Sequence, residues 1–166
     1  MPDEPKWGWI ANNPIVNVSW QDAVNYCLWL SKKLNKNITL PTEAQWEYAA
    51  KGGEFDINRM YSGGSPGWHN INSNQKAHAV ALNKPNKLRL FDMSGNVSEW
   101  CLDWYNNNYY KSSPNNNPIN TKESNFRVSR GGHWFSDKAM CRISNRSSLK
   151  PNTKSSGVGF RVVTNY

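Results

Sequence analysis

The sequence is short of cysteine and of long apolar runs. Its three cysteines, Cys27, Cys101 and Cys141, allow at most one internal disulfide, which excludes the multi-disulfide framework of many small secreted domains. The apolar runs are far too short to span a bilayer, so no membrane-spanning segment is expected. The first residues, Met1 to Glu4, have no signal-peptide character. We therefore expect a cytoplasmic protein, or the mature part of an exported one.

Charged and aliphatic residues are also scarce. Charged residues make up 19% of the chain and hydrophobic residues 37%, whereas nine tryptophans help raise the aromatic share to 13%. This composition predicts a core of a few large rings rather than many aliphatic side chains. A chain of 166 residues has room for one such core, so we expect residues 1–166 to form a single domain. Polar loop residues throughout residues 105–124 favour an irregular fold over a helical bundle.

The net charge of +8 does not indicate a nucleic-acid partner. The lysines are scattered, and the basic residues form only short pairs such as Lys32 and Lys33. Nucleic-acid-binding domains gather their basic residues in a block or along one face. We therefore expect a solvated basic surface and no nucleic-acid ligand.

Two helices are predicted early in the chain. Ser19 and Asp22 provide an N-cap and a first-turn acid for a helix from Trp20 to about residue 34. Thr42 and Gln45 form a capping box for a second helix, which should end at Gly52 and Gly53. The first helix has a continuous apolar face at helical spacing. Its members are Trp20, Ala23, Val24, Cys27 and Leu28.

The rest of the chain predicts loops and short strands. Residues 54–98 lose regular periodicity, and turn-forming residues fill 63–67. Short alternating runs indicate a small antiparallel sheet beside the two helices, which makes the expected fold class α+β. The expected strands are residues 97–102, 126–131, 141–146 and 159–163.

Four sequence blocks then carry a family resemblance. They are residues 14–23, residues 40–53, residues 91–100 with the run FDMSGNVSEW, and a closing block with RGGHW at 130–134 and GFR at 159–161. In this order and spacing they resemble the formylglycine-generating-enzyme or sulfatase-modifying-factor domain over nearly the whole chain. The resemblance implies a loop-rich C-type-lectin-like fold. Members usually carry further N-terminal strands before the first block, so we expect a shortened version of the domain.

The resemblance also implies one calcium ion in the third block. Carried over by position, the ligands would be the side chains of Asp92 and Glu99 and the backbone carbonyls of Gly95 and Val97. Calcium takes six to eight hard oxygen ligands, and a turn that contains glycine lets carbonyls and carboxylates converge. The alternative is that Asp92 and Glu99 only cap turns.

The reactive end of the family is incomplete in this sequence. In oxidases of the family, two cysteines flank a short turn and hold copper for the redox chemistry, and copper(I) favours soft sulfur ligands. Only the second cysteine is present, as Cys141, and Ser136 stands where the first would fall. Copper is therefore expected only if the chain is an oxidase, with Cys141 as its reactive residue.

Two functions follow from this pattern. The first is a non-catalytic module that binds a protein or peptide ligand, a use that the variable proteins of diversity-generating retroelements make of the same fold. The alternative is a copper-dependent oxidase that converts a substrate cysteine to formylglycine. Under the first function, loop residues after the Gly-Gly pair would face the ligand. They are Trp134, Phe135, Ser136, Asp137, Ala139, Arg142, Ser144 and Ser148.

The arginines of the closing blocks allow two interpretations. Their planar guanidinium groups suit recognition of a peptide or an acidic ligand. They also suit an internal role, in which they bind loop carbonyls and stack on tryptophan rings. The residues concerned are Arg130, Arg142, Arg146 and Arg161.

Overall fold

The computed structural model describes residues 1–54 and 58–164. Helix α1 (Trp20–Leu34) and helix α2 (Glu43–Ala50) lie where the sequence predicts them. In α1 the Ser19 hydroxyl accepts from the backbone N–H of Asp22, and the Asp22 carboxylate accepts from the backbone N–H of Ser19. Thr42 and Gln45 form the equivalent reciprocal pair at α2. The predicted N-cap at Ser19 and the predicted capping box at Thr42 are therefore confirmed, and Ser19 with Asp22 forms a capping box as well.

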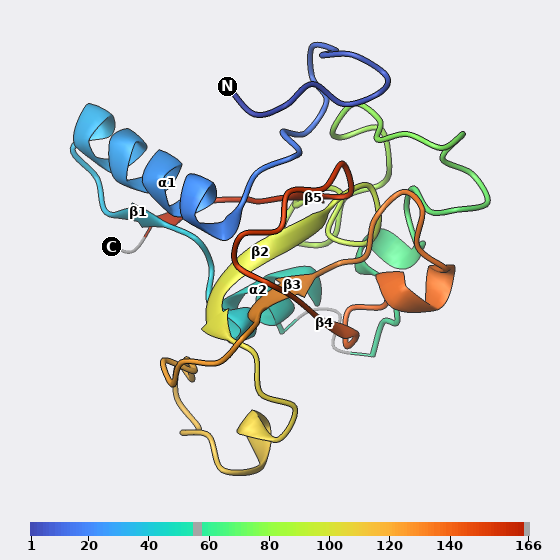
Figure 1. The fold of residues 1–166 in the computed structure, drawn as a ribbon. Coiled ribbons are helices and arrows are strands. Elements are labelled where there is room, and N and C mark those ends of the chain that lie inside the picture. The colour runs from blue at the N-terminus through green and yellow to red at the C-terminus, as the bar shows by residue number, and fades with distance from the viewer. Residues whose placement is uncertain (55–57, 165–166) are drawn as a thin grey trace.

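The strands of the described residues form two small sheets (Figure 1). In the larger sheet, β2 (Ser98–Trp104) is central and pairs antiparallel with β3 (Arg127–Arg130) and parallel with β5 (Val158–Gly159). The outer strand β4 (Arg146–Leu149) pairs antiparallel with β3. The second sheet joins β1 (Ile38–Thr39) to β6 (Val163–Thr164). The α+β class is confirmed, although one pairing of the larger sheet is parallel.

Two of the expected strands are placed differently. Residues 141–146 were expected to be a strand, but Lys138–Cys141 form the 3-10 helix η3 and the strand begins only at Arg146. The expected strand at residues 159–163 is divided, because its first residue ends β5 and its last begins β6. Two further 3-10 helices, η1 (Ser62–Gly64) and η2 (Tyr109–Lys111), lie in loops.

The core contains two buried tryptophan rings, but most of its buried apolar residues are aliphatic, so the predicted scarcity of aliphatic side chains in the core is wrong. Trp46 and Trp100 are almost completely buried, in separate clusters on either side of β2. Each indole N–H has a partner: Trp100 Nε1 donates to the Val18 carbonyl at 3.0 Å, and Trp46 Nε1 donates to Glu99 Oε2 at 2.6 Å. A buried indole that lacked such a partner would lose the free energy of a hydrogen bond. The two rings therefore fill space in the core, and these hydrogen bonds fix their orientation.

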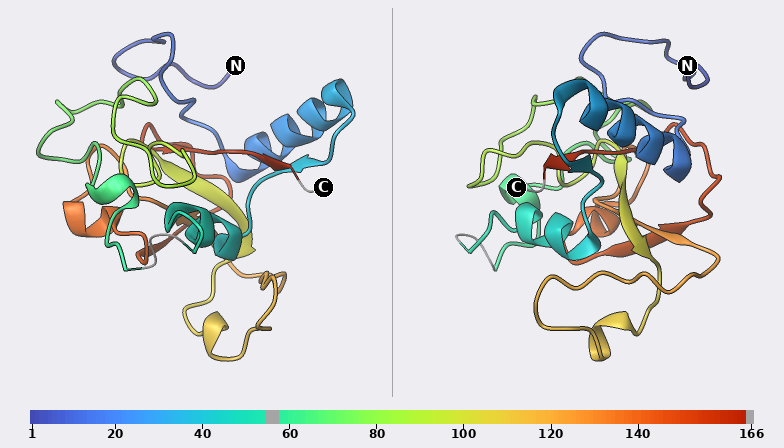
Figure 2. Two further views of the ribbon diagram at one scale, coloured as in Figure 1. Left: turned by 180° about the vertical axis from the view of Figure 1, so that it is seen from behind. Right: turned by 90° about the vertical axis from the view of Figure 1, so that its left-hand side faces the viewer.

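The long loop after β2 is attached at its base to the sheet. Figure 2 shows the loop projecting from one end of the molecule. Asp103 accepts from the backbone N–H of Asn120 at 2.9 Å, and the Asn120 side chain donates to the Trp104 carbonyl at 2.7 Å. Beside this base, the Arg127 guanidinium lies 3.6 Å from the Trp20 ring centroid and 3.5 Å from that of Trp104. The two rings therefore hold the cation between them.

Over the residues that the structure describes, no helix is both long and apolar enough to cross a membrane.

Candidate functional site

The candidate site is a turn and 3-10 helix that follow strand β3. Gly131 and Gly132 have φ angles of 95° and 70°, a left-handed conformation that glycine adopts readily. A Cβ atom added to Gly132 would lie 2.7 Å from Cys141 Sγ. The pair of glycines therefore reverses the chain and lets Cys141 of η3 pack directly under the turn.

Cys141 is a buried, unpaired thiol. Its exposed fraction is 0%, and burial raises its pKa to about 11. The other two cysteines are also free and buried, Cys27 on α1 and Cys101 on β2. They belong to different core clusters. The site therefore contains one thiol, in its protonated form near neutral pH.

Ser136 is committed to a contact within the turn. Its Oγ lies 2.8 Å from Nδ1 of His133, and its backbone carbonyl accepts from the N–H of Asn70 at 3.0 Å. Burial lowers the pKa of His133 to about 4, so this imidazole is neutral near pH 7. A copper ion held between two thiolates does not fit a buried thiol and a serine hydroxyl engaged by histidine. Within residues 1–54 and 58–164 no group of three or more His, Cys, Asp or Glu side chains is arranged to hold a metal.

Aromatic rings cover the turn. Trp134 packs edge-on against Trp7 with centroids 5.4 Å apart, and its Nε1 donates to the Ser156 carbonyl at 2.9 Å. Phe135 lies against the rings of His133 and Trp134, at centroid distances of 3.7 and 4.5 Å, and is 49% exposed. Trp134 therefore anchors the turn, and Phe135 presents a ring to solvent.

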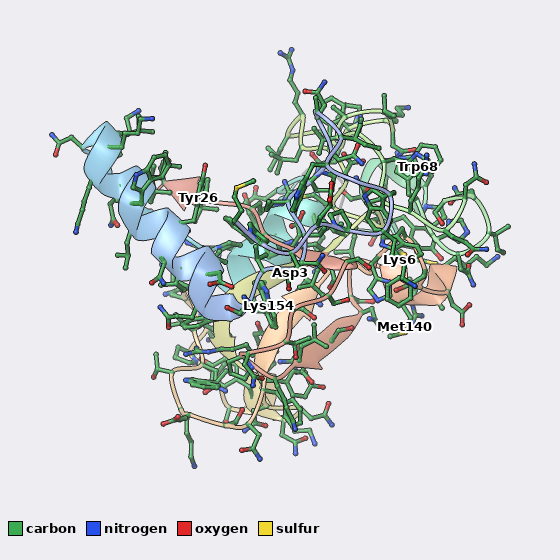
Figure 3. All side chains as sticks on the ribbon, turned by 45° about the horizontal axis from the view of Figure 1, so that its top comes forward. Asp3, Lys6, Tyr26, Trp68, Met140 and Lys154 are labelled. Carbon is green, nitrogen blue, oxygen red and sulfur yellow. The ribbon has the colours of Figure 1, made fainter. Side chains whose placement is uncertain are left out.

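The eight residues expected to face a ligand separate into two groups. Ser136 is buried, Trp134 is partly buried against Trp7, and Ser148 lies in β4 opposite Val128. The other five are exposed around η3, on the side of the molecule away from α1, where Figure 3 labels the neighbouring Met140. These five, which we call the η3 face, are Phe135, Asp137, Ala139, Arg142 and Ser144.

The structure adds two loops that the sequence analysis missed. Asn70 donates from its side chain to Asp137 Oδ1 at 2.7 Å, which places the 80% exposed Ile71 next to the turn. On the other side, the backbone N–H of Ile143 donates to the carbonyl of Met60 at 2.9 Å, and Met60 is 59% exposed. These contacts join segments more than sixty positions apart, and no local pattern signals them.

Three of the four closing-block arginines have an internal role. Arg130 is fully buried, pairs with Glu47 and donates to the Asn145 carbonyl at 2.6 Å. Arg146 donates twice to Glu43, and Arg161 donates twice to Glu99. Their guanidinium groups connect loops and strands, as the second interpretation predicts.

Arg142 is the exception among the four. Its side chain is exposed, and its Nε donates to the Ala139 carbonyl at 3.0 Å. Its two terminal nitrogens have no hydrogen-bond partner among the described residues. It therefore remains a candidate for ligand recognition.

Three of the four expected calcium ligands lie together. Asp92, Val97 and Glu99 line one cavity of about 390 Å³, and Arg161 lines it too. The Glu99 carboxylate accepts from Arg161 Nε at 2.5 Å and Nη2 at 2.7 Å, as well as from Trp46. A guanidinium thus already supplies the positive charge beside these acids. As arranged, the residues do not offer a calcium ion the six to eight oxygens that it takes.

The architecture defines a class: two helices, small curled sheets and long ordered loops make a C-type-lectin-like domain. Residues 3–166 match the family model of the sulfatase-modifying factor enzyme 1-like domain. The chain therefore belongs to this family, as the sequence blocks indicate.

Known relatives agree with this assignment. The chain is 37% identical over 171 residues to a formylglycine-generating enzyme of Streptomyces coelicolor, covering 90% of this chain and 52% of the enzyme. It thus spans about half of that relative. Among solved structures it is similar to Treponema denticola variable protein 1, with a TM-score of 0.84, 27% identity and coverage of 96% and 74%. PvdO from Pseudomonas aeruginosa has a TM-score of 0.83, 27% identity and coverage of 98% and 66%.

Proposed function

We propose that this chain is a non-catalytic module that binds a protein or peptide ligand through the η3 face. The observation that carries the proposal is the state of the family's two reactive positions. Ser136 is engaged by His133, and Cys141 is buried beneath Gly132. One thiol offers copper(I) half of the thiolate pair that it favours.

The exposure of the η3 face supports binding. Phe135 offers a half-exposed ring on a turn that Trp134 holds in place. Aromatic residues on a rigid frame commonly act as anchors at protein interfaces, since little conformational entropy is lost when they bind. Side chains on such a loop can be exchanged without change to the sheet beneath.

The similarity to a variable protein supports a more specific form of the proposal. Treponema denticola variable protein 1 shares the fold over 96% of this chain. We propose that residues of the η3 face, and others in 134–156, differ among closely related copies in one genome. Sequences of such copies would test this form, which fails if substitutions are spread evenly along the chain.

The oxidase is the competing function, because formylglycine-generating enzymes are among the relatives. Copper(I) titration of the purified protein, followed by incubation with a cysteine-containing peptide under oxygen, separates the two. We expect no stoichiometric tight copper binding and no aldehyde in the product. Tight equimolar copper with formation of an aldehyde would overturn the proposal.

A further inference from the structure

A cavity beside the η3 face has a cationic lining. It measures about 410 Å³ and lies between the end of α2, the loop that carries Met60, and the chain after η3. Its described lining residues include three cations and no acid. They are Lys51, Asn58, Arg59, Met60, Arg142, Ile143 and Ser144.

The two carboxylates of α2 are already paired with other cations. Glu47 accepts from Lys51 Nζ at 2.7 Å, and the same carboxylate pairs with the buried Arg130. Glu43, the next acid along α2, accepts both bonds from Arg146. These two carboxylates are thus shared among three cations, none of which is Arg142. Among the described lining residues, cations therefore outnumber carboxylates.

Arg142 offers the geometry that an acid requires. Because its Nε is held by the Ala139 carbonyl at 3.0 Å, the guanidinium is oriented while its two terminal nitrogens remain available. A guanidinium in this state can bind a carboxylate with two parallel hydrogen bonds. The exposed hydroxyl of Ser144 lines the same cavity and can donate a further bond.

We propose that the ligand of the η3 face is an acidic peptide segment, with an aspartate or glutamate side chain bound at Arg142 and Ser144. This inference rests on the proposed binding function and names its ligand class. Apolar residues of the segment would contact Met60, which lines the cavity, and Phe135, which precedes η3. The net charge of +8 would increase the rate of association with such a segment.

Selection from a phage-displayed library of random 12-residue peptides tests the proposal on the whole chain. We expect peptides selected by the wild-type protein to be enriched in Asp and Glu over the unselected library. Selected peptides should bind Arg142→Glu at least about tenfold more weakly, because a bidentate charged contact becomes a repulsion. Lys111→Glu is the matched control, since it makes the same charge change on η2, in the loop that projects away from η3 (Figure 1). We expect less than a twofold loss for it.

Several outcomes would overturn the proposal of an acidic peptide ligand. Selected peptides that are neutral or basic, or the absence of any enrichment, would do so. An equal loss in both variants would also do so, because the effect would then be the long-range field alone. Peptides that lose affinity on Phe135→Ala but not on Arg142→Glu would end this inference and keep the binding module. An aldehyde product in the copper assay would instead remove the proposed function itself.

Discussion

The Arg146 guanidinium and the Glu43 carboxylate, 103 positions apart in the chain, are joined by two hydrogen bonds of 2.7 and 2.8 Å. Glu43 is 1% exposed, and the fully buried Arg130 lies beside it, with its Nε 3.5 Å from Glu43 Oε1. Arg146 also donates to the carbonyl of Asn106 and lies over the ring of Tyr110. The pair therefore links α2, β4 and the long loop after β2 at one point.

Removing the carboxylate should destabilise the fold strongly. Glu43→Gln keeps the shape of the side chain but leaves Arg146 without its carboxylate partner and the buried Arg130 with Glu47 alone. An uncompensated buried charge costs about 3–5 kcal/mol, which we expect as the loss in the free energy of unfolding by urea. The control is Lys51→Ala, which breaks a partly exposed pair with Glu47 and should cost less than about 1 kcal/mol. Similar losses in the two variants would contradict this account.

Stability should depend on pH through His133. Burial lowers its pKa from 6.5 to about 4 in the folded protein, so the unfolded chain takes up a proton first as pH falls. This contribution to stability is complete above pH 6.5 and is lost progressively as pH falls toward 4, by at most ~3 kcal/mol. Urea unfolding from pH 7 to 4.5 should show that loss in the wild type. In His133→Asn the loss of stability should be smaller by this amount. Parallel plots of unfolding free energy against pH for the two proteins would refute the role of His133.

The helices could be predicted from the sequence because their signals are local. Ser19 with Asp22, and Thr42 with Gln45, lie within one turn of the helix that they cap. Strands β1 and β6 have two residues each and depend on a partner more than a hundred positions away. No alternation can develop over two residues, so the pairing could not be foreseen.

The exposed loop that forms the candidate site could be located from the sequence for the same reason. The residues around η3 follow each other in the sequence, and five of the eight expected are exposed there. The strand expected at Cys141 was wrong because Gly131 and Gly132 fold the chain back, and η3 places the thiol beneath Gly132. Ile71, Met60 and the cationic cavity come from tertiary contacts alone.

Introducing a second thiol at residue 136 should create a copper(I)-binding site. Ser136→Cys places two sulfurs five positions apart across the turn and η3, the pair that copper(I) favours. We expect about one tightly bound copper(I) per chain in this variant and none in the wild type, measured by competition with a chromogenic chelator. Ser136→Ala, which removes the hydroxyl without adding sulfur, is the control. A wild type that binds as tightly as Ser136→Cys would show that Cys141 needs no second thiol.

Calcium should raise the thermal midpoint of Arg161→Ala but not that of the wild type. In the wild type the guanidinium of Arg161 binds both oxygens of Glu99, and we expect the same thermal midpoint in calcium and in EGTA. Removing it leaves Asp92 and Glu99 in one cavity without that positive charge, so calcium should recover part of the lost stability. A calcium-dependent midpoint in the wild type would instead favour the four ligands that the resemblance implies.

Two glycines near the turn should respond differently to alanine. In Gly157→Ala the new Cβ would lie 2.7 Å from Phe135 Cε1 and 3.1 Å from His133 Cγ, and the half-exposed Phe135 has room to move aside. We expect a loss of less than about 2 kcal/mol in unfolding free energy. The affinity for peptides selected on the wild type should fall by more than about 1 kcal/mol if Phe135 is their anchor.

In Gly132→Ala no exposed side chain can move aside to relieve the clash. Its Cβ would lie 2.7 Å from the buried Cys141 Sγ, at a residue whose φ is 70°. The clash and the left-handed backbone act together, so we expect a loss of more than about 3 kcal/mol. Urea unfolding of both variants, with peptide binding of Gly157→Ala, measures the difference. Unchanged peptide affinity in Gly157→Ala, in which Phe135 is displaced, would exclude that ring from the binding site, because binding would then be insensitive to its position.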